Sequence, residues 1–387
     1  MERVSGIEPP SSAWKADIIS HYTTPACSSF YKERDDSSLI CDRMQESVLI
    51  TSLILFVLFY TVILPVALTW GIPPGGPVSE IQHVISVDQF TPEWIAELFE
   101  RAKYWKRSLC RPGGVASAVL SSRMMISLFY EPSTRTRLSF ESAMNRLGGR
   151  VIGTEDAEQF SSATKGETLE DTIHVVSGYG DVIVLRHKER GAAVRAAAVS
   201  TVPIINAGDG DGEHPTQALL DLFTIQETAG PPKDQHVVFV GDLNKGRTVH
   251  SLARLLSKYG TSMSFVSPEH LAIPEHLCGE LGLSSACEYR SLDVVIERAT
   301  VIYMTRTQNE RHHEGQVGAG DGSDYGLTRE LVAWMRHDTV VLHPLPRNSE
   351  IPTWFDQDPR AHYIDQAHRG VPLRMALLEM LLNPLPE

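Results

Sequence analysis

The feature that most constrains the fold is a series of short, apolar runs rich in β-branched residues, separated by stretches with helical spacing. Runs of this length, bounded by polar or glycine-rich loops, are typical of strands buried on both faces. Such strands occur mostly in parallel sheets joined by crossover helices. We therefore predict an α/β fold with two doubly wound domains. The predicted strands are 124–130, 182–185, 202–205, 237–240, 262–266, 300–304 and 339–342.

Two helices frame this series. A first helix is predicted to begin after Thr91, a good N-cap, with Pro92 at the first helical position and Phe90 and Ile95 spaced as a hydrophobic staple. A last helix is predicted over 373–382, because its leucines recur on one side. A terminal helix of this kind often packs back on an earlier domain.

The residues that follow the predicted strands share an unusual chemistry. Ligands of open α/β sheets bind outside the carboxyl ends of the strands. All but one of the predicted strands are followed there by a cation or a histidine. One such arginine is usually a solvated loop residue, but a succession of them predicts a site for ligands with several negative charges. The residues are Arg135, Arg186, His214, Arg247, Arg306 and His343.

The most specific of these segments is Ser133-Thr134-Arg135-Thr136. Pro132 ends the preceding strand, and the next residues open a helix that Gly148-Gly149 ends. The free amides and the positive end of a helix dipole bind phosphate, and Arg135 can add forked, charge-assisted hydrogen bonds. The alternative is an ordinary Ser/Thr cap beside a surface arginine.

Length, charge and missing motifs exclude several classes of protein. The 387 residues fit two domains and an additional N-terminal segment. The net charge of −13 argues against nucleic acid or an anionic membrane surface as the main partner, since both demand a basic face. We expect no metal and no cofactor. The scattered cysteines form no Cys-x-x-Cys pair and fit a reduced, cytoplasmic protein, and neither a Gly-x-Gly-x-x-Gly nor a Walker pattern supports a nucleotide.

The N-terminal segment needs separate treatment. No charged residue occurs from Ser47 to Ser79, and 48–70 is apolar and long enough to cross a bilayer. It lies too deep in the chain for an ordinary signal peptide. A buried helix is disfavoured by the length. Two interpretations stay open: a membrane anchor, through which alone the chain would contact a membrane, or an over-extended gene start.

Taken together, the motifs resemble those of the aspartate and ornithine carbamoyltransferases, over about residues 81–382. Ser133-Thr134-Arg135-Thr136-Arg137 is similar to the carbamoyl phosphate signature of both branches. The other motifs resemble those of the aspartate branch. They are His214-Pro215-Thr216-Gln217, Gly241-Asp242-Leu243 with Gly246-Arg247-Thr248, Thr305-Arg306 with Gln308, and His343-Pro344-Leu345-Pro346-Arg347. The cysteines of the ornithine motifs His-Pro-Cys-Gln and His-Cys-Leu-Pro, and the Ser-Met-Gly loop of that branch, are absent.

The resemblance implies an activity and a domain order. The activity is transfer of the carbamoyl group from carbamoyl phosphate to the amino group of L-aspartate, an early step of de novo pyrimidine biosynthesis. A carbamoyl phosphate domain is expected over 79–215 with the last helix at 368–387, and an aspartate domain over 216–367. Residues 1–78 lie outside the resemblance. A homotrimer with shared active sites is implied, and whether regulatory chains associate stays open.

The resemblance also implies a role for each site residue. Catalysis is assigned to Arg135, Thr136, Arg186 and His214. Carbamoyl phosphate is assigned to Ser133, Thr134, Arg135, Thr136, Arg186, His214 and Gln217, with Ser161 and Lys165 from a neighbouring subunit. Aspartate is assigned to Lys165, Arg247, Arg306, Gln308, Pro344 and Leu345.

Two rival functions and two departures from the family pattern remain. The rivals are an ornithine carbamoyltransferase and a catalytically silent, membrane-tethered relative. Asn244-Lys245 departs from the usual order in the family's loop, which affects loop contacts rather than chemistry. The Gly- and Asp-rich loop 314–325 is also unusual, so the closing motion of the aspartate domain is left open.

Overall fold

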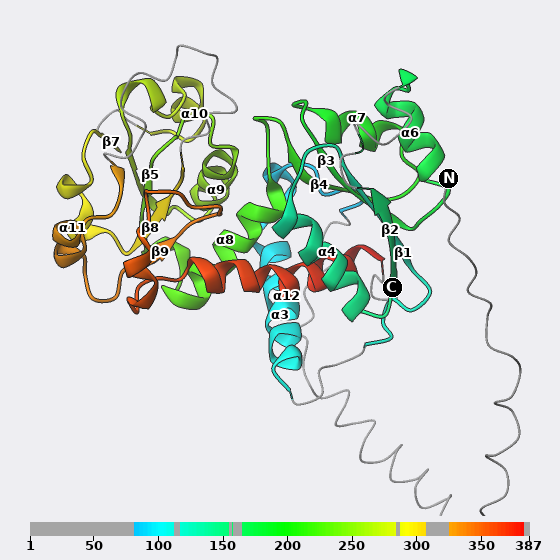
Figure 1. The fold of residues 1–387 in the computed structure, drawn as a ribbon, viewed down its shortest axis with the longest axis horizontal. Coiled ribbons are helices and arrows are strands. Elements are labelled where there is room, and N and C mark those ends of the chain that lie inside the picture. Colours follow the sequence, from blue (N-terminus) through cyan, green and yellow to red (C-terminus); the bar gives the residue numbers. More distant parts are fainter. Residues whose placement is uncertain are drawn as a thin grey trace, which may run out of the picture. The chain divides into compact units, whose positions relative to one another are not determined.

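The computed structural model of the chain describes residues 81–111, 117–154, 157, 165–283, 287–306 and 325–382. Its strands form two sheets, and within each sheet every pair of neighbouring strands is parallel. Helices cover both sheets (Figure 1). This confirms the predicted α/β class with two parallel, doubly wound sheets.

None of the described helices combines the length and the apolar character that a membrane crossing needs. The apolar segment 48–70 and the unusual loop at 314–324 lie outside the described residues. The interpretations of both therefore stay predictions.

The first sheet has the strand order β2-β1-β3-β4. Ile126 at its centre lies opposite Ile152 on one side and Ile183 on the other. The inner strands are buried on both faces because their Met, Ile, Leu and Val side chains meet helices above and below. The strands are β1 (Met124–Phe129), β2 (Arg150–Thr154), β3 (Val182–His187) and β4 (Ile204–Asp209).

The second sheet has the order β7-β6-β5-β8-β9. Its centre is aromatic: Phe239 lies between Phe265 and Tyr303, with ring centroids 5.3 and 5.6 Å away. The strands are β5 (His236–Val240), β6 (Ser262–Val266), β7 (Glu288–Tyr289), β8 (Val301–Met304) and β9 (Val340–Leu342).

Two strands were not predicted. β2 is the edge of the first sheet and consists of exposed and half-buried residues, so it has no continuous apolar run. β7 is a two-residue edge strand that begins with a glutamate. β4 also starts later than predicted, at Ile204, because Pro203 has no N–H to give to the sheet.

The described α-helices range from six to twenty residues in length. The α-helices are α3 (Pro92–Leu109), α4 (Thr134–Arg146), α6 (Leu169–Val176), α7 (Ala192–Val199), α8 (Pro215–Thr228), α9 (Arg247–Ser257), α10 (Glu275–Glu280), α11 (Arg329–Trp334) and α12 (Tyr363–Leu382). The short 3₁₀ helices are η2 (Val87–Gln89), η4 (Pro232–Asp234), η5 (Glu269–Leu271), η7 (Leu292–Val294), η8 (Ile296–Arg298) and η11 (Thr353–Gln357).

The predicted start of the first helix is confirmed, whereas that of the last helix is not. The Thr91 hydroxyl accepts a hydrogen bond from the Trp94 amide at 3.2 Å, which confirms the predicted cap of α3. The predicted start of the last helix was wrong: α12 begins ten residues earlier, at Tyr363, and carries Pro372 within it. The polar residues and the proline in 363–372 hide the helical pattern from the sequence.

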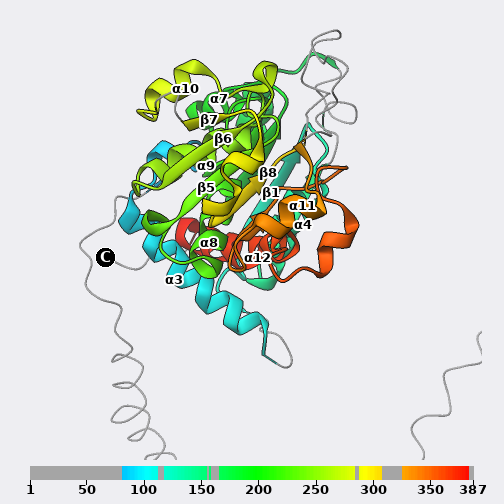
Figure 2. The same cartoon turned by 90° about the vertical axis from the view of Figure 1, so that its left-hand side faces the viewer.

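Two helices connect the sheets. α8 contacts β4 of the first sheet and β9 of the second, and α12 packs along α3, α4 and α8. Figure 1 and Figure 2 both show α12 running beside α8. The predicted domain boundary, between residues 215 and 216, falls at the start of α8. Because α8 contacts both sheets, it packs against both halves of the fold.

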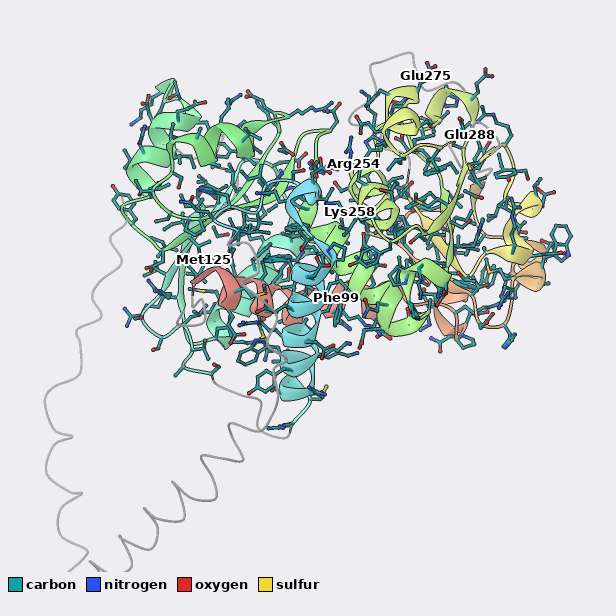
Figure 3. The ribbon with its side chains drawn as sticks, turned by 180° about the vertical axis from the view of Figure 1, so that it is seen from behind. Phe99, Met125, Arg254, Lys258, Glu275 and Glu288 are labelled. Atoms are coloured by element: carbon teal, nitrogen blue, oxygen red, sulfur yellow. The ribbon has the colours of Figure 1, made fainter. Side chains whose placement is uncertain are left out.

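The segment before α3 is also tied to the second half. The ammonium group of Lys258, at the end of α9, donates to the backbone carbonyls of Val87, Asp88 and Phe90 at 2.9 to 3.0 Å. Figure 3 shows Lys258 beside this part of the chain, with Phe99 further along α3. Three carbonyls on one ammonium group fix the turn against α9.

We predict that Phe99→Ala lowers the free energy of unfolding by about 3–5 kcal/mol, because it empties a fully buried ring site. Phe99 packs on Phe223 of α8, with ring centroids 5.0 Å apart. Urea unfolding followed by circular dichroism measures the change. Arg107→Ala, an exposed residue of the same helix, should stay within about 0.5 kcal/mol of the unsubstituted chain. Equal effects of the two variants would contradict this packing.

Candidate active site

The strand orders identify where each sheet offers a site. In the first sheet the chain turns to one side after β1 and to the other after β3, and in the second sheet it does so after β5 and β8. Ligands of such sheets bind at the carboxyl ends of the strands where the order reverses. Arg135, Arg186, Arg247 and Arg306 lie at or just after the ends of these four strands. The arginines predicted from sequence therefore occupy both reversal points.

The start of α4 forms the predicted cradle. Ser133 is the N-cap residue, but its side chain makes no capping hydrogen bond, and the first turn contains no acidic residue. Burial and the positive charge of Arg306 lower the pKa of the Arg135 guanidinium. A cation that is partly desolvated and faces a second cation favours an anion between them.

Arg186 and Arg247 share one carboxylate. Glu131 Oε2 lies 2.6 Å from Arg186 Nη2 and 3.2 Å from Arg247 Nη2. Backbone carbonyls hold the other ends: Arg186 Nη1 donates to Ala207 at 3.1 Å, and Arg247 Nη1 donates to Gly210 at 2.6 Å. Both guanidinium groups are therefore fixed before any ligand arrives.

Gly208 allows these two arginines to come close. Its φ of +114° belongs to the left-handed region, and an added Cβ would lie 2.9 Å from Arg247 Cζ and 3.0 Å from Arg186 Nη1. No side chain fits there without moving both arginines.

His214 and Gln217 enter the site from the start of α8. The His214 amide donates to the Ser251 hydroxyl of α9 at 3.1 Å. Gln217 Nε2 donates to Asp221 Oδ1, one turn along α8, at 2.8 Å. Both side chains are nearly buried, so their polar groups can act in a poorly hydrated environment.

The turn after β9 is held by a buried histidine. His343 Nδ1 accepts a hydrogen bond from the Leu345 amide, and Nε2 donates to Glu350 Oε1, both at 2.8 Å. Burial lowers the pKa of His343, which keeps the ring neutral. Burial acts to raise the pKa of Glu350, but the hydrogen bonds from His343 and the Asn348 amide outweigh it and leave that pKa lowered. The bond to Nδ1 supports the positive φ of 55° at Leu345.

These groups meet in one cavity of about 860 Å³. Of the residues predicted from sequence, it is lined by Ser133, Thr134, Arg135, Thr136, Arg186, His214, Gln217, Arg247, Arg306, His343, Pro344 and Leu345. Lys165 is exposed and does not line the cavity of its own chain. Ser161 and Gln308 lie outside the described residues.

Among the lining residues that the sequence did not predict are Glu131, Gln366 and Arg374. Glu131 is an acid among cations and was passed over because a site for anions calls for positive charge. Gln366 and Arg374 come from α12, whose first turns the sequence did not reveal as helix. The one signal in the sequence that could have indicated Glu131 is its position, between a predicted strand and the Ser133-Thr134-Arg135 run.

The cavity is built to bind anions. Its groups include guanidinium donors, hydroxyls, histidines and the free amides of a helix start, which suit phosphate and carboxylate oxygens. Over the described part of the chain, His, Cys, Asp and Glu side chains nowhere gather in threes as metal ligands do.

Two family profiles match the chain. One describes the carbamoyl-P binding domain of aspartate/ornithine carbamoyltransferases and matches residues 82–227. The other describes the Asp/Orn binding domain and matches residues 233–381. The chain belongs to the aspartate/ornithine carbamoyltransferase family.

Similar proteins lie on the aspartate branch of this family. A chloroplastic aspartate carbamoyltransferase of Arabidopsis thaliana is 47% identical over 308 residues, 78% of each protein. An aspartate carbamoyltransferase catalytic subunit of Thermoplasma acidophilum is 44% identical over 303 residues, 78% of this chain and 98% of the relative.

Solved structures agree with this branch. The aspartate transcarbamoylase of Trypanosoma cruzi in complex with carbamoyl phosphate and aspartate has a TM-score of 0.74 at 36% identity, covering 81% of this chain and 100% of that one. The catalytic subunit of M. jannaschii aspartate transcarbamoylase has a TM-score of 0.71 at 42% identity, covering 79% and 99%.

We predict that the cavity binds inorganic phosphate without any other ligand. Arg135→Ala should weaken this binding by roughly tenfold or more, because it removes charge-assisted hydrogen bonds in a partly desolvated site. Isothermal titration calorimetry measures the change. Arg107→Ala removes the same charge from the exposed face of α3 and should bind phosphate as the unsubstituted chain does. Equal affinities of the two variants would refute the cradle.

Proposed function

We propose that the chain transfers the carbamoyl group of carbamoyl phosphate to the amino group of L-aspartate, giving N-carbamoyl-L-aspartate and phosphate. The observation that carries this is the meeting, in one cavity, of a phosphate-binding helix start from the first sheet and two arginines from the second. A phosphate donor and a dicarboxylate acceptor suit those two sets. Solved relatives described as complexes with carbamoyl phosphate, aspartate and carbamoyl aspartate support the same pair.

The half built on the first sheet binds the donor. Ser133, Thr134 and Arg135 hold the phosphate at the start of α4, and Arg186 reaches it from β3. Thr136, Arg186 and His214 donate to the carbonyl oxygen as negative charge develops on it. Losing one such donor typically costs about 10²–10³ in turnover. Gln217 accepts from the carbamoyl NH₂.

The half built on the second sheet binds the acceptor. Arg306 and Gln308 take one end of aspartate, and Arg247 takes a carboxylate. Because Arg247 already lies against Glu131, that carboxylate shares the guanidinium with Glu131 or replaces it. The Pro344-Leu345 turn closes the pocket with its backbone, and His343 and Glu350 hold the turn.

The chemistry requires positioning more than acid–base groups. The aspartate amine attacks the carbonyl carbon, the C–O bond to phosphate breaks, and the departing phosphate takes the amine proton. Holding two reactants in line can supply about 7–11 kcal/mol of the barrier reduction. A rigid set of arginines that positions both reactants is therefore sufficient for this reaction.

Substrate preference tests the reaction. We predict turnover of radiolabelled carbamoyl phosphate with L-aspartate and none with L-ornithine, because Arg247 and Arg306 at the acceptor site repel the side-chain ammonium of ornithine. Product formation at saturating carbamoyl phosphate with each amino acid measures this. Turnover with ornithine alone would overturn the proposal, and no turnover with either would favour a silent relative.

We also propose a homotrimer in which Ser161 and Lys165 complete the site of a neighbouring subunit, with Lys165 also reaching the aspartate. The position of Lys165 outside the cavity of its own chain supports this.

Mixed trimers test the shared site. Arg135→Ala and Lys165→Ala chains should each be nearly inactive alone. Equal mixing should restore about a quarter of the unsubstituted activity, because half of the cradles are intact and half of these face an intact lysine. Activity after dissociation and reassociation of the two proteins gives the measurement. A mixture no more active than its parts would show that each site lies within one chain.

A further inference from the structure

The orientation of Gln217 is set by a residue that does not touch the cavity. Gln217 lines the cavity, and its amide nitrogen donates to Asp221 Oδ1 at 2.8 Å. Asp221 follows one turn later on α8, is 0% exposed and is not part of the cavity wall. A glutamine side chain alone could present either its NH₂ or its carbonyl to a ligand.

Asp221 receives donors from three directions. Besides Gln217, Gln366 Nε2 of α12 donates to Oδ1 at 2.6 Å, and the Tyr303 hydroxyl of β8 donates to Oδ2 at 2.7 Å. Burial raises the pKa of Asp221, and the three donors and the charge of Arg374 lower it only in part, so that the pKa is about 6 and the carboxylate is ionised at neutral pH. An ionised carboxylate only accepts hydrogen bonds, so each glutamine must turn its NH₂ toward it.

The same carboxylate orients both amides. Gln366, with its NH₂ on Asp221, presents its carbonyl to the His343 amide at 2.9 Å. Gln217, with its NH₂ on Asp221, has its carbonyl oxygen as the group to present to the cavity. Turning the Gln217 amide over would set its oxygen against a buried carboxylate, at the cost of an unsatisfied and repelled acceptor.

We propose that Asp221 is a positioning residue that fixes the Gln217 carbonyl toward the cavity and so selects a donor substrate that carries NH₂ on its reacting carbonyl. This inference rests on the proposed function, in which Gln217 accepts from the carbamoyl group. An acyl phosphate with a methyl group at that place, such as acetyl phosphate, meets an acceptor without a partner and is rejected. Inorganic phosphate binds the cradle without needing Gln217.

The test variant is Asp221→Leu, which keeps the size of the side chain and removes the acceptor. We expect KM for carbamoyl phosphate to rise roughly tenfold, and the preference for carbamoyl over acetyl phosphate in kcat/KM to fall by a similar factor. The inhibition constant of inorganic phosphate should stay within about twofold of the unsubstituted value. A merely structural role would weaken both ligands together.

Three further variants sharpen the test. Asp221→Asn keeps an oxygen at the Oδ1 position, with its NH₂ toward Tyr303, and should restore most of the lost preference. Thr224→Val removes another buried hydrogen bond of α8, from Thr224 to the Leu220 carbonyl, and should change neither constant. Gln217→Leu should lose the preference by itself, and adding Asp221→Leu to it should cost no more.

The outcomes separate the two proposals. If the unsubstituted chain does not turn over carbamoyl phosphate, the proposed function fails. If it does and Gln217→Leu loses the preference while Asp221→Leu keeps it, only the positioning role fails. Should Asp221→Leu not fold, Asp221→Ala makes the same comparison, since its smaller side chain leaves room for a water to satisfy the donors.

Discussion

The structure depends on positive charge gathered at the cavity and on the carboxylate that keeps it in place. Arg135 and Arg186 come from the first sheet, and Arg247 and Arg306 from the second. Glu131, at the end of β1, binds one arginine from each sheet. This arrangement lowers the repulsion between the two halves, yet leaves a field that favours anionic ligands.

Much of this could be predicted from sequence, because the signals are local. The inner strands of both sheets appear as apolar runs, the cap at Thr91 is a local hydrogen bond, and arginines after strands follow a topological rule. The parts that were missed depend on distant contacts. β2 is recognisable only by pairing with β1, and the first turns of α12 are held by distant contacts, of Tyr363 with the core of the second sheet and of Gln366 with Asp221.

The site shows the same division. Arg135 and His214 stand in recognisable motifs, whereas Glu131 and Asp221 have binding partners far along the chain. Asp221 by itself is a lone acid on an apolar helix. It acquires a role only when β8 and α12 bring Tyr303 and Gln366 against it. Residues that contact a ligand are therefore easier to predict from a sequence than residues that orient those contacts.

The close approach at Gly208 has a consequence for tolerated variation. The position contributes no functional group, yet both its backbone angle and the two guanidinium groups beside it exclude every side chain. Even the smallest addition, one methyl group, would displace Arg186 and Arg247 together. In a library of single variants, this residue should therefore be as intolerant as the arginines themselves, although nothing in its own chemistry would explain why.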